Sequence, residues 1–171
     1  MIDFQKYLNK ISSDTYAIFL FHGVIDSKEN QIRNYTNKHL LAEDFNNLIY
    51  QLSKVGKPIS LDQLIEYHEN DIPLPPKSYS ITFDDGFENN FSIALPILEK
   101  FSTPATFYIS TNLVDSNEMS WIDKIEYCFE KIEEKSIKLP WSNQLFKLKS
   151  ADSKIKCLDE IRYKVKKYQK K

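Results

Sequence analysis

YSITFDDGFENN, residues 79–90, is the stretch that decides the fold. Large apolar side chains alternate with smaller residues over 79–83, and this period of two is typical of a β-strand. Asp84 and Asp85 follow the strand at once, and Gly86 permits a sharp exit that a residue with a Cβ resists. The pattern therefore predicts a buried strand that ends in an acidic loop.

Asp84 and Asp85 are the first candidates for chemistry. Two neighbouring carboxylates repel each other, so the pair is favourable only where a cation or a proton transfer uses it. An Asp-Gly dipeptide is also common in solvated turns, and on spacing alone this second interpretation stays open.

His22 is a third candidate, because it directly follows another apolar run at residues 16–21. The ends of parallel strands are where α/β proteins place their ligand-binding loops. A lone histidine after a strand is more often structural or solvated, and both interpretations stay open. We interpret His39 and His68 as surface histidines, because neither stands beside another candidate ligand.

Helices are predicted between and after these strands. Apolar residues at helical spacing predict a crossover helix over 41–55 and a helix that begins at Leu61 and turns Ile65 inward. A further helix places Phe91 on its apolar face and kinks or restarts near Pro96.

The rest of the chain continues the alternation. A third strand is predicted at 105–109, a helix from 122 to about 135, a small hairpin over 137–148 and a terminal helix over 155–168. Such an order of strands and helices indicates an α/β protein with parallel strand pairing.

Composition limits the possible classes of protein. With 171 residues, 42% hydrophobic and a net charge of −1, the chain is predicted to form one soluble domain over residues 1–171. Nothing in this balance indicates a nucleic acid or membrane partner. The longest early apolar run, Ala17 to Phe21, is too short for a signal peptide, so a cytoplasmic location is predicted.

Several motifs in order along the chain carry a resemblance to a known family. They are TFDDG at 82–86, NN at 89–90, ALPIL at 94–98, PATFYI at 104–109, FHGV at 21–24 and WIDKIEY at 121–127. Together they resemble the polysaccharide deacetylase family, also called the NodB homology domain or carbohydrate esterase family 4. The resemblance touches most of residues 16–130.

The resemblance implies a distorted (β/α) barrel. A closed barrel of this type needs about 200 residues or more, and only three strands are evident before the helix and hairpin near the C-terminus. We therefore predict an α/β fold that is a partial barrel of the polysaccharide deacetylase type, incomplete at the C-terminus. Residues 137–171 are predicted to be a hairpin-plus-helix insertion or tail of this single domain.

The resemblance also implies a metal-dependent hydrolase that removes acetyl groups from N-acetylated sugars or polysaccharides. Carried over residue by residue, Asp85 is a ligand of a divalent metal, commonly zinc, and Asp84 is the general base for the attacking water. His22 is the general acid that protonates the departing sugar amine.

One part of the family pattern is missing. The family's two other metal ligands are histidines of a His-Ser/Thr-x-x-His motif, and this chain has no histidine after His68. Since one carboxylate cannot hold a catalytic zinc ion, the metal site is expected to be incomplete in this chain. The alternative function is a catalytically inactive truncated fragment or a glycan-binding remnant. For the chain as a whole, the predicted partners are an N-acetylated glycan substrate and either a second copy, bound through an exposed sheet edge, or a complementing C-terminal fragment.

Overall fold

The computed structural model describes residues 8–9, 11–12, 15–27, 32–116 and 118–169. The chain divides into two compact units, the first formed by residues 1–28 and 38–114 and the second by residues 29–37 and 115–171. Each unit has its own cluster of buried apolar side chains.

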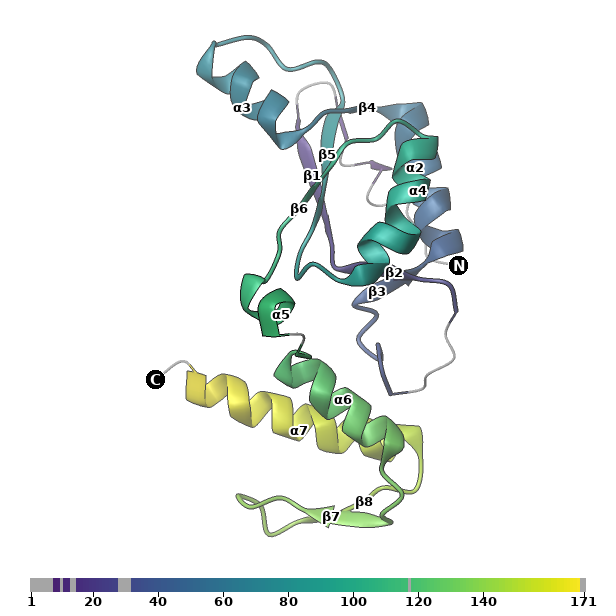
Figure 1. Ribbon diagram of the computed structural model, residues 1–171, viewed down its shortest axis with the longest axis vertical. Coiled ribbons are helices and arrows are strands. Elements are labelled where there is room, and N and C mark those ends of the chain that lie inside the picture. The colour runs from purple at the N-terminus through teal and green to yellow at the C-terminus, as the bar shows by residue number, and fades with distance from the viewer. Residues whose placement is uncertain (1–7, 10, 13–14, 28–31, 117, 170–171) are drawn as a thin grey trace. The chain divides into compact units, whose positions relative to one another are not determined.

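Strand β5 (Ser78–Phe83) is the centre of the first unit (Figure 1). Ile81 pairs with Phe19 of β1 (Ala17–Phe21) and with Ala105 of β6 (Ala105–Phe107), so these two strands flank β5. The short strand β4 (Lys57–Pro58) pairs with the start of β5, and all these pairings are parallel. Every residue of β5 is buried, as is typical of a central strand in a parallel sheet. The predicted central strand is confirmed.

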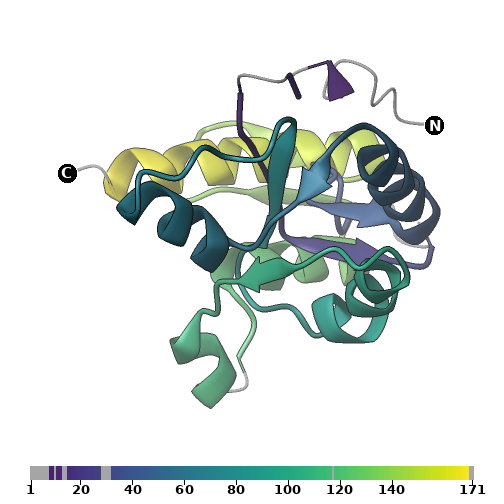
Figure 2. The same ribbon diagram turned by 90° about the horizontal axis from the view of Figure 1, so that it is seen from above.

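Helices α2 (Ala42–Val55) and α4 (Leu95–Lys100) lie side by side against this sheet (Figure 1, Figure 2). Their buried faces form one apolar core with the alternate residues of β5 that point toward them; the largest members are Phe45, Leu48, Ile49, Leu52, Tyr79, Ile81, Phe83 and Leu98. The helix stripe predicted over 41–55 is therefore confirmed as the inner layer of the fold.

The interruption predicted at Pro96 is also present. A short π-helix, η1 (Asn90–Ala94), gives way to α4, in which Pro96 is the second residue. A proline is tolerated there because the N–H groups of a first helical turn have no partner within the helix. The expectation for Phe91 is wrong, since its side chain is 74% exposed.

Helix α3 (Leu61–Glu69) begins as the sequence predicts. The Gln63 amide donates to the Ser60 hydroxyl oxygen at 3.0 Å, and the Ser60 amide donates to Gln63 Oε1 at 3.0 Å, which completes the capping box. The inward orientation expected for Ile65 is wrong, because none of the helix residues is buried and Ile65 is 53% exposed.

Two three-residue strands lie between β1 and α2, where no strand was predicted from the sequence. Strand β2 (Gly23–Ile25) pairs in parallel with β3 (His39–Leu41), and Val24 is fully buried. Runs of three residues are too short to display an alternating pattern, so only the folded chain reveals them.

The second unit contains α6 (Trp121–Lys131), the antiparallel hairpin of β7 (Ser136–Lys138) and β8 (Leu145–Lys147), and α7 (Ala151–Gln169). Its core gathers apolar side chains from these elements, among them Phe129, Leu139, Leu148 and Leu158, around Ile32. The predicted helix, hairpin and terminal helix are confirmed. A further short helix, α5 (Thr111–Ser116), follows β6 in the chain.

The α/β fold with a partial barrel is confirmed. Among the described strands, β1 pairs with β5 alone, and its Ile18 and Leu20 side chains are exposed on the face of the sheet opposite the helical core.

No helix in the described part of the chain is long and apolar enough to cross a membrane. The cytoplasmic location stays a prediction from the sequence.

Candidate functional site

The predicted site residues lie at the carboxyl edge of the parallel sheet. Phe21 at the end of β1 is paired with Phe83 at the end of β5, and the Asp84 amide donates to the Phe21 carbonyl at 2.9 Å. His22 and Asp84 therefore leave two neighbouring strands at the same edge. The structure brings together the two stretches that the sequence singles out separately.

The backbone turns sharply after Asp84. Asp85 and Gly86 both have a φ of 73°, in the left-handed region that glycine enters freely and aspartate tolerates. A Cβ atom on Gly86 would lie 2.9 Å from Cγ2 of Ile109, so glycine is needed here for space as well as for conformation. The sharp exit predicted for this glycine is confirmed.

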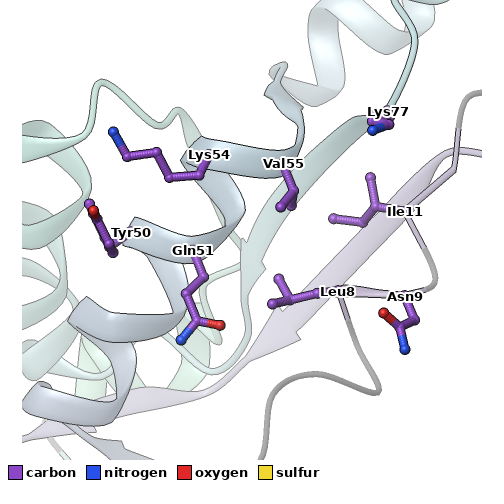
Figure 3. Close-up of a pocket in the computed structure, with 8 residues that line it drawn as sticks. All are labelled: Leu8, Asn9, Ile11, Tyr50, Gln51, Lys54, Val55 and Lys77. Carbon is purple, nitrogen blue, oxygen red and sulfur yellow. The ribbon is translucent and has the colours of Figure 1, made fainter.

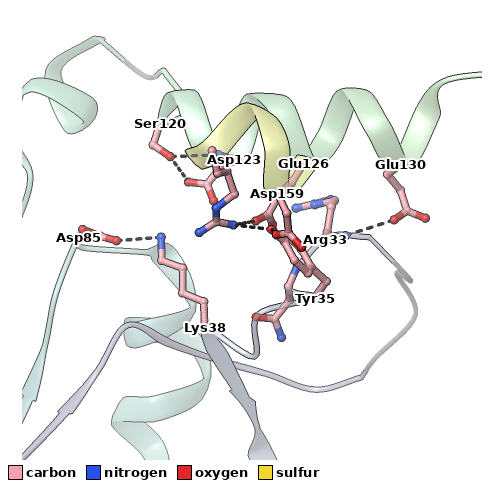
Figure 4. Close-up of polar contacts among 11 residues, drawn as sticks. Arg33, Tyr35, Lys38, Asp85, Ser120, Asp123, Glu126, Glu130 and Asp159 are labelled. Carbon is pink, nitrogen blue, oxygen red and sulfur yellow. Dashed lines mark hydrogen bonds and ion pairs between the residues drawn. The ribbon is translucent and has the colours of Figure 1, made fainter. Parts of the chain in front are cut away.

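Lys38 supplies a positive charge to this turn. Its Nζ lies 2.9 Å from Oδ2 of Asp85 and 4.3 Å from the centre of the Phe87 ring (Figure 4). Both side chains of the ion pair are partly shielded from water, with 22% of Lys38 and 36% of Asp85 exposed. Lys38 could not be predicted from the sequence, because no local pattern links a lysine before a short strand to an acidic loop far along the chain.

His39, the next residue, lies beside the same loop, and the expectation of a surface histidine is wrong for it. Its Nδ1 is 3.1 Å from Nδ2 of Asn89, and its ring meets the Phe87 ring edge-on with 4.7 Å between the centres. A Cβ on Gly23 would lie 2.2 Å from His39 Nδ1, so the glycine after His22 makes room for this ring. His68, by contrast, is exposed as predicted.

The described residues do not fit a catalytic metal ion on their own. A catalytic zinc needs three protein ligands and one open position. Within the described ranges there is no group of three histidine, cysteine, aspartate or glutamate side chains that could hold a metal. Oδ2 of Asp85, the predicted ligand, contacts the Lys38 ammonium instead.

A cavity of about 570 Å³ lies at the opposite end of β5 (Figure 3). Its walls come from Leu8, Asn9 and Ile11, from helix α2 and from Lys77, the residue before the strand. The described residues that line it include no aspartate, glutamate, histidine or cysteine, the side chains that usually bind a metal ion.

Comparison with known sequences agrees with the resemblance to polysaccharide deacetylases. The family model for polysaccharide deacetylases matches residues 71–157, half of the chain, and this range contains Asp84 and Asp85 but not His22. The poly-β-1,6-N-acetyl-D-glucosamine N-deacetylase of Escherichia coli K12 is 37% identical over 101 residues. That alignment covers 59% of this chain and 15% of the relative's length.

Two solved structures share the fold. The Streptococcus pyogenes deacetylase PplD, solved in complex with acetate, matches 61% of this chain and 46% of its own with a TM-score of 0.52 at 19% identity. The de-N-acetylase from Aggregatibacter actinomycetemcomitans matches 85% of this chain and 50% of its own, with a TM-score of 0.52 at 20% identity. The chain thus spans about half the length of either structure. From the family match over half of its length and the acidic loop at the carboxyl edge of its sheet, we conclude that this chain belongs to the polysaccharide deacetylase family.

Proposed function

We propose that residues 1–171 form one deacetylase-type domain, with 137–171 as an insertion or tail, that carries part of the active site of a glycan deacetylase. The observation that supports this most is the adjacency of His22 and Asp84 at the carboxyl edge of β1 and β5. Ligand-binding loops occupy this edge in parallel α/β sheets.

In the proposed reaction, Asp84 is the general base. A water oxygen attacks the carbonyl carbon of an N-acetyl group while its proton passes to the Asp84 carboxylate. The C–N bond then breaks, the acetyl group leaves as acetate, and His22 donates a proton to the departing sugar amine.

The substrate class is an N-acetylated glycan. The Escherichia coli relative is named for removing acetyl groups from poly-β-1,6-N-acetyl-D-glucosamine. We therefore propose an N-acetylglucosamine polymer as the first substrate to test.

We propose Asp85 as one ligand of a divalent metal. The metal is proposed to be zinc, because zinc is implied by the resemblance to the family. Since the described residues hold no group of three suitable ligands, a second segment has to supply the rest. That segment belongs to a longer form of the chain or to a separate complementing fragment.

Acetate release from N-acetylglucosamine oligomers tests this function, measured on the chain together with its complementing segment or on a longer form. Asp84→Asn is expected to lower the rate by about 100-fold or more, because the general base is lost. Asp62→Asn, in the first turn of α3, is the matched control and is expected to leave the rate unchanged. The absence of acetate release from every N-acetylglucosamine polymer would contradict the proposal.

The second candidate function is that of a glycan-binding remnant without catalysis. The lack of a three-ligand group in the described ranges favours it. It predicts glycan binding that survives both Asp84→Ala and Asp85→Ala and that does not depend on added metal. Titration of the chain with N-acetylglucosamine oligomers, with and without a chelator, separates the two candidates.

A further inference from the structure

We propose that His39 is a positioning residue, which fixes the acidic loop over residues 84–90 against the segment that follows His22. This inference rests on the proposed function, because the two segments that it joins carry the proposed proton-transfer groups, Asp84 and His22. It adds a second histidine, which holds these groups in place without exchanging a proton itself.

The His39 ring contacts two side chains of the acidic loop. Its Nδ1 lies 3.1 Å from Nδ2 of Asn89, and the ring meets that of Phe87 edge-on with 4.7 Å between the centres. Among the described residues, Oδ1 of Asn89 is buried and has no hydrogen-bond partner. The contact with His39 therefore orients the Asn89 side chain, and its loss would leave a buried amide without compensation.

The same ring lies against the backbone that follows His22. A Cβ atom on Gly23 would collide with the His39 ring and would lie 2.6 Å from Oδ1 of Asn89. Gly23 is buried and is the residue that pairs with His39 where strands β2 and β3 meet. The absence of a side chain at this position thus lets both partners of the hydrogen bond approach the backbone next to His22.

The acidic loop is therefore attached on both sides of His22. On one side, the Asp84 amide donates at 2.9 Å to the carbonyl of Phe21, which precedes His22. On the other side, the histidine–asparagine pair contacts the residue that follows His22. Proton transfer in a hydrolytic reaction needs both groups at hydrogen-bond reach of the substrate, and a small displacement of either one lowers the rate.

A positioning role needs the hydrogen bond of His39 and not its proton. Asparagine carries its side-chain oxygen and nitrogen close to where histidine carries Nδ1, so His39→Asn can still pair with Asn89. Its amide does not act as a general acid or base at neutral pH. His39→Leu keeps an apolar side chain beside Phe87 but cannot form the hydrogen bond.

The first measurement is amide hydrogen exchange, followed by NMR in the 171-residue chain and its variants. In His39→Leu the Asn90 amide, which donates to the Phe87 carbonyl within the loop, is expected to exchange at least about fivefold faster. The Ile59 amide, which donates to Tyr79 at the opposite end of β5, is expected to keep its rate. A local acceleration separates positioning of the loop from a general loss of stability.

Two further variants complete this comparison. His39→Asn is expected to exchange at Asn90 within about twofold of the unmodified chain, because the hydrogen bond is restored. His68→Leu is the matched control, since His68 is an exposed histidine on α3, and it is expected to change neither amide. Circular dichroism establishes that each variant is folded, and Asn89→Ala removes the same hydrogen bond from the other side if His39→Leu is not.

The second measurement is acetate release by the chain with its complementing segment or by a longer form. His39→Leu is expected to lower kcat by about tenfold or more and to leave KM within about twofold, because the substrate still binds but the proton-transfer groups are displaced. His39→Asn is expected to recover most of kcat.

Faster exchange confined to the loop in His39→Leu, with recovery in His39→Asn, supports the proposal. Unchanged exchange at Asn90, an equal acceleration at Ile59, or full kcat in His39→Leu overturns it. An equal loss of kcat in His39→Asn and His39→Leu also overturns it, since that result indicates proton transfer by the histidine. If the unmodified protein releases no acetate, the proposed function fails, whereas the exchange rates still decide whether His39 holds the loop.

Discussion

Asp85 and Glu126 each pair with a cation at 2.9 Å, yet their surroundings differ in almost every other respect. Asp85 stands on a left-handed turn, is 36% exposed and meets the flexible Lys38 side chain. Glu126 stands on a helix, and only 10% of its side chain is exposed. The distance between opposite charges therefore says little about what an ion pair does.

Glu126 has partners on both carboxylate oxygens. Arg162 Nη1 donates to Oε1 at 2.9 Å, and the backbone N–H of Asn34 donates to Oε2 at 3.1 Å. Arg162 also donates to the Tyr35 hydroxyl, which in turn donates to Asp159 at 2.6 Å. A buried carboxylate with all its partners in place serves the fold, whereas a half-exposed one with a movable partner can exchange that partner.

The largest effect is expected for Glu126→Ala. Removing the carboxylate leaves Arg162 without its buried partner, and we expect the free energy of unfolding to fall by about 3 kcal/mol. Urea denaturation measures it. Glu118→Ala is the control, because Glu118 pairs with Lys124 at 2.6 Å but is exposed, and its loss is expected to change stability little. Similar losses for the two variants would mean that burial does not make the Glu126 ion pair more important for stability than the exposed one.

The next largest effect on stability is expected for Gly86→Ala, in the loop that contains Asp85. The left-handed backbone and the nearby Ile109 side chain both oppose a Cβ, and we expect a loss of about 1–2 kcal/mol in the free energy of unfolding. Thermal unfolding of this variant beside Glu88→Ala, an exposed position two residues further along the chain, is the measurement. An unchanged melting temperature would mean that the turn accommodates the added methyl group without a loss of stability.

A smaller effect is expected from pH in the Glu126 cluster. Burial raises the pKa of Tyr35 to about 12, and its hydrogen bond with Asp159 acts in the same direction. The folded state then holds the phenol proton more tightly than the unfolded chain does, so this contribution is present below pH 10 and is lost between pH 10 and about 12. Stability measured across that range is expected to fall less steeply in Tyr35→Phe. Equal slopes would exclude Tyr35 as the cause.

The smallest effect on stability is expected for Asp85→Asn. The variant loses the attraction to Lys38 but also loses the repulsion from Asp84, so the free energy of unfolding is expected to change by less than about 0.5 kcal/mol. Urea denaturation at neutral pH in the presence of a chelator measures it. A loss as large as that of Glu126→Ala would mean that Asp85 is structural.

Features that depend on residues close together in the chain could be predicted from the sequence, whereas features that depend on distant residues could not. The strand β5, the start of α3 at Leu61 and the restart at Pro96 depend on neighbours within a few residues, and all three are confirmed. Lys38 and His39 reach the acidic loop through a parallel pairing of β2 with β3, which leaves no periodic trace in a single sequence.

For Ile65 and Phe91 the sequence predicted burial that the structure does not show. Their spacing marks an apolar helix face, but both side chains are exposed in the structure. Periodicity reports which side of a helix is apolar and not whether another element covers that side. The acidic loop itself was found from the sequence because both its carboxylates and its glycine are consecutive.

The most direct test compares conservative loss of charge in the two regions within one acetate-release assay. Asp84→Asn and Glu126→Gln are measured in the chain with its complementing segment, together with their melting temperatures. We predict that Asp84→Asn loses activity and keeps its melting temperature, whereas Glu126→Gln melts earlier but retains activity at temperatures where it is folded. Full activity in Asp84→Asn, or loss of activity in a fully folded Glu126→Gln, would contradict the assignment of the carboxyl edge of β5 as the reactive part of this chain.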